Sequence, residues 1–167
     1  MTDQEPKVEL ANPESKLAAK YTFRILIMDT VEHVNQLKIA CKNAGHSVIP
    51  AHTIKEAFAF LDGKNHADVI ICAAYLEDES MFEFLTRLRS NPDHKNSMFM
   101  TLALEPGPMG IRVNDSTKQT GKHLGADAFV NMPVFDAPLL IAEIQKLLPK
   151  VPWLETDRQK KLAERDI

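Results

Sequence analysis

The sequence alternates short apolar runs with amphipathic segments along most of its length. Five runs of strand length are mostly apolar and span residues 23–28, 47–51, 67–74, 98–104 and 128–132. Such runs predict strands buried on both faces, because a strand with one face in water alternates apolar and polar residues. Pro50 lies in the second run and cannot donate a hydrogen bond to a neighbouring strand, so we expect that strand at a sheet edge.

Apolar residues recur with helical spacing in the segments that connect these runs. The positions are Val34, Leu37, Cys41 and Ala44; Ile54, Ala57, Phe58 and Leu61; Met81, Phe84, Leu85 and Leu88; and Leu140, Ile144, Leu147 and Leu148. Thr53 with Glu56, and Ser80 with Glu83, have the spacing of a capping box and predict where two of the helices begin. Strands that alternate with helices predict a parallel sheet with helices on both faces.

One connection is longer than the others and rich in proline and glycine. Residues 104–115 contain two prolines and two glycines, which predict a projecting loop, and a weakly apolar helix is expected at about 116–124. A loop of this kind is either a specificity element or a tolerated surface insertion. Its candidate contact residues are Pro106, Met109, Ile111 and Arg112.

The composition is that of a soluble protein with one domain. Hydrophobic residues make up 44% and charged residues 26% of the 167 residues, and no apolar run approaches the roughly 18 residues of a membrane helix. We expect a flexible arm at 1–21, one domain at 22–148 and a charged, helical extension at 149–167. The polar amino terminus lacks a secretory signal, which favours the cytoplasm.

Charge and ligand-forming residues exclude several classes of function. The formal net charge is −3 and lysine and arginine are spread along the chain, which argues against nucleic-acid binding. Cys41 and Cys72 lie in apolar segments and are expected to pack in the core. The six histidines show no ligand spacing, so neither a metal site nor a cofactor is predicted.

The order of these features resembles the receiver domain of bacterial two-component response regulators. The segment 125–127, Gly-Ala-Asp, with Phe129 and Pro133, matches the fifth-strand segment of that family, and residues 68–85 match its third strand and third helix in length and pattern. The resemblance covers about residues 22–148. It implies a flavodoxin-like (CheY-like) α/β fold with five parallel strands in the order 2-1-3-4-5.

The residues that carry phosphorylation in that family are mostly absent from this chain. Receivers place a phosphoacceptor aspartate after the third strand, an acidic pair after the first, a hydroxyl after the fourth and a lysine before the fifth-strand proline; the carboxylates hold a divalent metal. By position, the corresponding residues are Ala73, the pair Asp29 and Thr30, Leu102 (or Thr101 if the strand shifts by one residue) and Met132. The resemblance thus implies a site without a nucleophile or a lysine.

The remaining polar residues leave little room for metal-dependent phosphorylation. Asp29 alone would bind a hard cation weakly, and we favour a role in capping the first helix or binding loop amides. Glu77 and Asp78 lie several residues further along the loop, which argues against them as substitute acceptors. Phe129 matches the family's switch aromatic, and a core phenylalanine is the equal alternative.

These residues predict a pseudo-receiver: no enzyme, but a protein-interaction or regulatory module in bacterial signal transduction. The expected surface for a protein partner or a homodimer is the face formed by the fourth helix, fifth strand and fifth helix. Two alternatives remain open. One is a sensor that binds a small ligand, such as a nucleotide or quinone, in the vacated pocket. The other is the regulatory domain of a longer signalling protein, with 149–167 as a connector.

Overall fold

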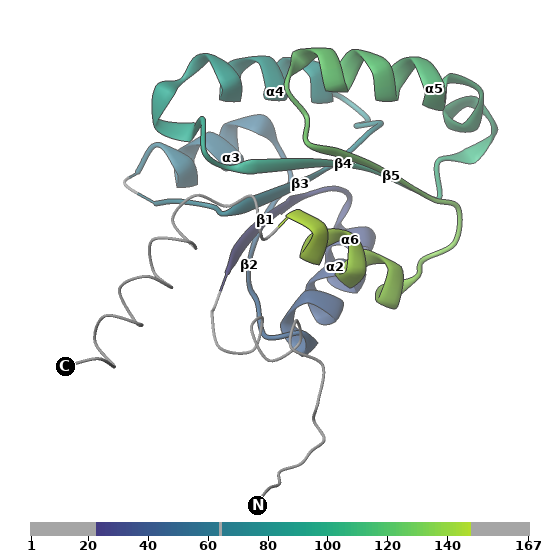
Figure 1. The fold of residues 1–167 in the computed structure, drawn as a ribbon, viewed down its shortest axis with the longest axis horizontal. Coiled ribbons are helices and arrows are strands. Elements are labelled where there is room, and N and C mark those ends of the chain that lie inside the picture. Colours follow the sequence, from purple (N-terminus) through teal and green to yellow (C-terminus); the bar gives the residue numbers. More distant parts are fainter. Residues whose placement is uncertain (1–22, 64, 148–167) are drawn as a thin grey trace, which may run out of the picture.

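The computed structural model describes residues 23–63 and 65–147, and these form one α/β sandwich (Figure 1). Five parallel strands lie in the order β2-β1-β3-β4-β5. The strands are β1 (Arg24–Met28), β2 (Ser47–Ala51), β3 (Val69–Ala73), β4 (Met98–Leu104) and β5 (Ala128–Met132). The helices are α2 (Val31–Asn43), α3 (Ile54–Leu61), α4 (Met81–Ser90), α5 (Gly107–Leu124) and α6 (Ala137–Leu147), with a 3₁₀ turn at Pro92–His94. The predicted fold class and strand order are confirmed.

The sheet separates two apolar cores. Helices α2 and α6 cover one face, and α3, α4 and α5 cover the other (Figure 1). Val69 and Ile71 of β3 join the core under α2 and α6, whereas Ile70 and Cys72 join the core under α3 and α4. Because successive side chains of a strand point to opposite faces, a strand between two helical layers must be apolar throughout. All five residues of β3 are accordingly buried.

A proline marks the edge strand, and hydroxyl side chains cap the first turns of three helices. Strand β2, which contains Pro50, is an edge strand, as predicted. The Thr53 hydroxyl accepts a hydrogen bond from the Glu56 amide at 3.0 Å, and the Ser80 hydroxyl accepts one from the Glu83 amide at 3.3 Å. Thr30 caps α2 in the same way. Each cap satisfies an amide that has no partner within its helix.

The prediction of a projecting loop at 104–115 is wrong. Helix α5 begins at Gly107, so the connection after β4 consists only of Glu105 and Pro106. Pro108 lies in the first helical turn, where a residue needs no amide hydrogen for the helix, and this makes proline a signal for a helix start as much as for a loop. The helix predicted at about 116–124 is therefore the second half of an 18-residue helix.

The residues predicted for the loop lie on the first turns of that helix or just before it. Pro106 is the N-cap residue of α5. Met109 and Ile111 are 69% and 56% exposed, and Arg112 is also exposed. These side chains are therefore presented by a regular helix.

Arg89 organises the turn from α5 into β5. Gly125 adopts φ +110°, and a Cβ there would lie 3.0 Å from Arg89 Cγ. The Arg89 guanidinium donates to the carbonyl oxygens of Gly125 and Ser97 and pairs with Asp127 at 2.9 Å. Asp127 also accepts the Phe99 amide of β4 at 2.8 Å. The Gly-Ala-Asp segment thus ties α4, β4 and β5 together.

The two cysteines are buried in the cores, as predicted. Burial raises the pKa of the Cys41 thiol to about 12 and raises that of Cys72 as well, so both are protonated at neutral pH. Within 23–63 and 65–147 we find no helix with the length and apolar character needed to cross a membrane. The predicted arm at 1–21 and extension at 149–167 lie outside the described residues.

A buried histidine should make the stability of the fold sensitive to pH. His46 is 4% exposed, its ring lies 5.5 Å from that of Phe23, and neither ring nitrogen has a hydrogen-bond partner. Burial lowers the pKa of His46, so folding displaces its proton at mildly acidic pH. Its contribution to the free energy of unfolding is therefore present above about pH 6.5 and is lost as the pH falls toward the lowered value.

We expect His46→Phe to raise the free energy of unfolding by about 1 kcal/mol near pH 7, because two unsatisfied nitrogens leave the interior. The gain should be larger at pH 5. Urea unfolding at several pH values measures it, with His123→Phe as the matched change at an exposed histidine. An equal pH dependence in His46→Phe and the parent protein would contradict this account.

Candidate functional site

The carboxyl ends of the parallel strands meet at one edge of the sheet and enclose a small hollow. Its volume is about 120 Å³. We call it the edge hollow, and its lining residues are Asp29, Thr30, His33, Ala73, Tyr75, Leu102, Ala103, Leu104, Glu105 and Pro106. Open α/β sheets place their ligand and active sites at this edge.

The structure brings together several of the residues that correspond to the receiver phosphorylation site. Asp29, Thr30, Ala73 and Leu102 all line the edge hollow. Ala73, which the sequence resemblance matches to the phosphoacceptor aspartate of receivers, is only 6% exposed and has a methyl side chain.

The other two candidate positions lie outside the edge hollow. Thr101 lies on the opposite face of β4, with its hydroxyl 3.8 Å from the sulfur of Met81 on α4. Met132 is buried in the core under α2 and α6, and its sulfur accepts the Asp136 amide at 3.3 Å. Neither side chain can therefore act on a group bound at Ala73.

Asp29 binds a loop amide and a histidine. Its Oδ1 accepts the Thr30 amide at 2.7 Å and lies 3.1 Å from Nδ1 of His33. The helix cap itself is Thr30, so of the two structural roles expected for Asp29 it has the amide-binding one. Burial raises the pKa of Asp29, and the Thr30 amide and His33 partly offset that rise.

His33 connects two carboxylates across the edge hollow. Its Nδ1 faces Asp29, and its Nε2 lies 3.0 Å from Oε1 of Glu105, on the connection between β4 and α5. Burial lowers the pKa of His33, but Asp29 and Glu105 outweigh this and the net pKa is raised. Sequence analysis missed this residue. The available signal was its i, i+4 spacing from Asp29, but the contact with Glu105 depends on the fold.

Tyr75 crosses from the end of β3 to α5. Its hydroxyl lies 3.0 Å from the carbonyl oxygen of Gly110, 3.4 Å from the Thr117 hydroxyl, and within hydrogen-bond distance of the Asn114 side chain. Tyr75 is two residues beyond Ala73, and nothing in the local sequence indicated this contact, which spans at least 35 residues of chain.

The acidic loop after β3 has a structural role at one position. Glu79 accepts the amide of Ile54 at 2.9 Å and so satisfies the start of α3, whereas Glu77 and Asp78 are exposed. With Asp29, these three carboxylates line a second hollow of about 520 Å³ beside the edge hollow. Its charge disfavours anionic ligands such as nucleotides.

The charged side chains around the edge hollow contact one another. His33 lies between Asp29 and Glu105, and no lysine or arginine is among the lining residues. In the described part of the chain, no group of three or more His, Cys, Asp or Glu side chains has the arrangement of a metal site. Phosphoryl transfer to a side chain needs a nucleophile and cationic groups around the transferring oxygens.

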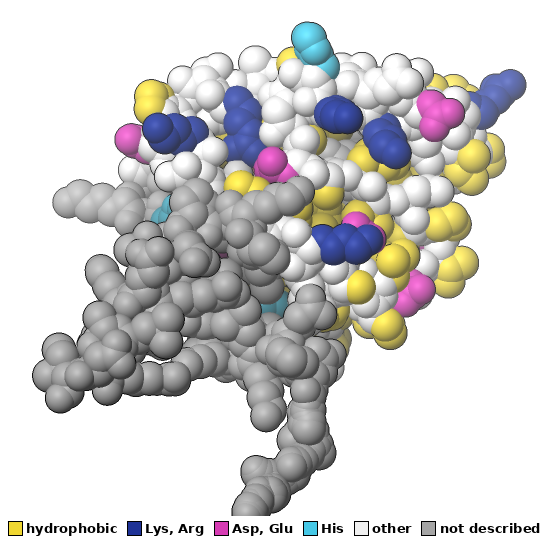
Figure 2. Space-filling view, in the orientation of Figure 1, with side chains coloured by type: hydrophobic (Ala, Val, Ile, Leu, Met, Phe, Trp, Pro, Cys, Tyr) yellow, Lys and Arg dark blue, Asp and Glu magenta, His cyan; other side chains and the backbone are white. Residues whose placement is uncertain are grey.

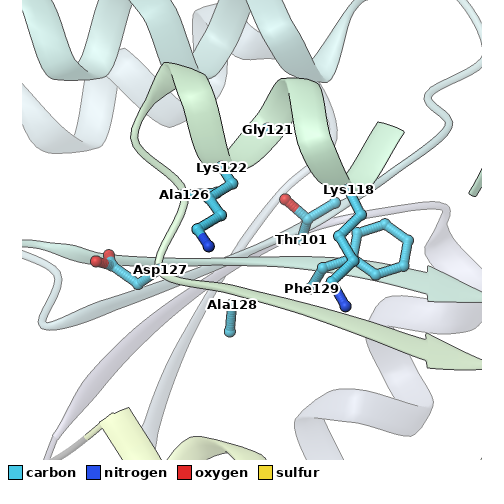
Figure 3. A pocket seen from close by; sticks show the side chains of 8 residues that line it. All are labelled: Thr101, Lys118, Gly121, Lys122, Ala126, Asp127, Ala128 and Phe129. Atoms are coloured by element: carbon cyan, nitrogen blue, oxygen red, sulfur yellow. The ribbon is translucent and has the colours of Figure 1, made fainter. Parts of the chain in front are cut away.

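A separate pocket of about 240 Å³ lies between α5 and β5 (Figure 3). Lys118 and Lys122 reach from α5 toward the sheet, and Phe129 of β5 lies beside Lys118. Phe129 is half-buried and belongs to neither apolar core. The pocket combines apolar groups with two lysines and with Asp127, whose carboxylate pairs with Arg89.

Exposed apolar side chains occur close to the start of α5. Met109 on α5 and Val134 after β5 are 69% and 75% exposed. Figure 2 shows hydrophobic side chains gathered toward the end of the molecule where α5 begins, and lysine and arginine side chains over the region of α4 and α5. A contiguous exposed apolar patch is a feature of interaction sites, so this region is a candidate interaction surface.

Comparison with known proteins shows similarity in structure. No protein-family model matches the sequence, and no curated protein matches it either. Among solved structures, the chemotaxis response regulator CheY4 of Vibrio cholerae is 25% identical, with a TM-score of 0.64 over 76% of this chain and 99% of that one. A CheY-like receiver domain protein from Methanospirillum hungatei is 19% identical, with a TM-score of 0.64 over 82% and 99%.

A two-component response regulator from Clostridium difficile is also similar. It is 19% identical, with a TM-score of 0.64 over 77% of this chain and 97% of that one. Each of these proteins is covered almost completely, so the similarity extends over a whole receiver domain. The chain therefore has the CheY-like receiver fold, which supports a role as a signalling module.

Proposed function

We propose that this protein is a pseudo-receiver: a receiver-fold signalling module that accepts no phosphoryl group and acts by binding a protein partner. The observation that carries the proposal is Ala73, which stands at the carboxyl end of the buried central strand where a receiver needs its nucleophile. A methyl group can neither attack phosphorus nor bind a metal.

The surroundings of Ala73 support the same proposal. The side chain that pairs with Asp29 in the edge hollow is His33, which also binds Glu105. Met132, at the position of the receiver lysine, is buried in the core under α2 and α6. Loss of the phosphoacceptor thus coincides with loss of the groups that would stabilise a phosphoryl group.

The interaction surface that we propose is the face formed by α5, β5 and α6. It carries the pocket with Lys118, Lys122 and Phe129, and the exposed side chains of Met109 and Ile111 lie at its α5 end. An apolar side chain of the partner, flanked by carboxylates, would match the pocket in size and charge. A second copy of this chain is the other candidate partner for the face.

The sensor alternative has weaker support. The edge hollow, at about 120 Å³, is well below the roughly 300 Å³ at which small-molecule pockets begin. The larger hollow beside it is lined by four carboxylates, Asp29, Glu77, Asp78 and Glu79, which would repel a nucleotide.

Phosphoryl analogues should leave the protein unchanged. With beryllofluoride and Mg²⁺, or with acetyl phosphate and Mg²⁺, we expect no site-specific change in the amide NMR spectrum, because Ala73 offers no acceptor oxygen. Localised shifts at Asp29 and Ala73 would contradict the proposed phospho-independence.

Restoring the carboxylate should destabilise the fold. In Ala73→Asp the new carboxyl group lies in a buried position beside Asp29, so its pKa should rise, at a cost of about 1.4 kcal/mol per unit of rise. Ala73→Asn has nearly the same shape without the charge and is the matched control.

The difference between the two variants should appear as the pH rises above about 4, where an unfolded aspartate ionises, and it should stop growing above the raised pKa of the folded state. Urea unfolding between pH 4 and pH 8 measures it. Equal stabilities of the two variants at pH 7 would show that the site tolerates a second carboxylate.

The lysines of the α5–β5 pocket should be required for partner binding. We expect Lys118→Glu with Lys122→Glu to weaken capture of the native partner at least tenfold, because two favourable charges become unfavourable. Lys38→Glu with Lys42→Glu, also four residues apart but on α2, is the control with the same change in net charge. Quantitative pull-down of the partner measures the effect. Equal losses in both variants would point to net charge and remove the pocket from the proposal.

A further inference from the structure

Helix α5 lacks the features that hold the other helices to the sheet. Its buried residues are Gly110, Thr117 and Gly121, and none of them has a large apolar side chain. In contrast, α4 buries two leucines, a methionine and a phenylalanine. Apolar burial is the main contribution to helix docking, so α5 must be held mostly by other contacts.

The sequence of α5 also forms a helix poorly by itself. The N-cap is Pro106 and makes no side-chain capping bond, and no acidic residue lies in the first turn. Glycine, threonine, asparagine and serine, all weak helix formers, make up much of its length. The first turns of α5 therefore depend on tertiary contacts.

Tyr75 supplies such a contact from the edge hollow. Its hydroxyl reaches Gly110, Asn114 and Thr117, which lie on one face of α5 with the i, i+4, i+7 spacing of successive turns. A single side chain thus connects two turns of the helix to the end of β3.

Gly110 allows the tyrosine ring to approach the helix. A Cβ at this position would lie 2.8 Å from Cε2 of Tyr75 and 2.7 Å from Cβ of Pro106. Both distances are far below a van der Waals contact, so the ring packs against the helix backbone only because residue 110 has no side chain. A side chain at residue 110 would therefore move the ring and, with it, the hydroxyl that contacts the helix.

His33 holds the connection that leads into α5. Glu105 is the only non-glycine residue with positive φ in the described part of the chain, at +48°. A residue held in this region is strained, and such strain persists only where surrounding contacts maintain it. The Glu105 carboxylate binds His33, and its amide donates to the Met132 carbonyl oxygen at 2.9 Å. Both contacts fall immediately before the helix.

We propose that Tyr75 and His33 form a two-point latch that holds the first three turns of α5 against the sheet. Both side chains line the edge hollow, so residues that surround the degenerate phosphorylation site set the position of the helix. Release of the Tyr75 hydroxyl loosens α5 while the rest of the fold stays intact. The latch rests on the proposed function only in that α5 belongs to the proposed interaction surface.

Hydrogen exchange of the isolated protein tests the latch. In Tyr75→Phe, which keeps the ring and removes the hydroxyl, we expect the amides of residues 110–117 to exchange about tenfold faster, because the helix loses the one hydrogen bond that the hydroxyl donates, to Gly110 or Asn114, and its contact with Thr117. Amides of β1 and β3 should exchange at the parent rate. Ser116→Ala is the matched control, since it removes an exposed hydroxyl from the same helix. Equal rates in Tyr75→Phe and Ser116→Ala would overturn the latch.

A second variant, compared in two backgrounds, separates the contact with Tyr75 from the other effects of a side chain at residue 110. Alanine is a better helix former than glycine, but a Cβ at residue 110 would approach both the Tyr75 ring and Pro106 Cβ. If Tyr75 holds the helix, Gly110→Ala displaces the ring and exchange in α5 becomes faster. In a Tyr75→Ala background only the approach to Pro106 remains, so Gly110→Ala should speed exchange less than it does in the parent protein. An equal effect of Gly110→Ala in the two backgrounds would overturn the proposal.

The part of His33 is tested by a double-mutant cycle. His33→Ala should speed exchange at the start of α5. The change in opening free energy in the double variant with Tyr75→Phe should differ from the sum of the two single changes, because both side chains hold the same helix. Additive effects would overturn the two-point form of the latch. These measurements need no partner. If they contradict the latch, the proposed function is still tested separately, by the pull-down with the lysine variants.

Discussion

The rest of the structure depends on one constraint: the central strand β3 is buried on both faces between two helical layers. That burial requires an unbroken apolar sequence and commits the chain to parallel strands joined by helical crossovers. It also brings the carboxyl ends of β1, β3 and β4 to one edge, where Asp29, Ala73 and Glu105 meet. The size of the hollow at that edge, about 120 Å³, is the space that the core and the surrounding loops leave.

Electrostatics at the edge follow from this geometry. Of the two carboxylates at the edge, Asp29 is buried and is costly to leave unpaired in a medium that screens charge poorly, whereas Glu105 is half exposed to water. Here the partner is a side chain of the protein itself, His33, which lies between them. The same pairing joins α2 to the connection that leads into α5.

Much of the fold could be predicted from the sequence because its signals are local. The apolar runs gave the strands, the threonine and serine caps gave the helix starts, and Pro50 indicated the edge strand. The start of α5 was missed because proline and glycine are common both in loops and in the first turn of a helix. The arrangement of the edge was predicted only in part: Ala73 and Asp29 follow from their places after strands, whereas the contacts of His33 and Tyr75 join residues 72 and at least 35 positions apart. No pattern within one element encodes such pairs.

The small buried residues of α5 have a consequence for how the protein can diverge. Where a helix inserts leucine and phenylalanine into a core, its sequence is constrained by packing, and changes on one face disturb the whole domain. The fully buried positions of helix α5 hold only glycine and threonine, and Leu124 at its end is partly buried, so its outward positions can vary with little effect on folding. Natural variation can therefore accumulate on this helix and change the surface that it exposes, while the sheet and the other helices remain as they are.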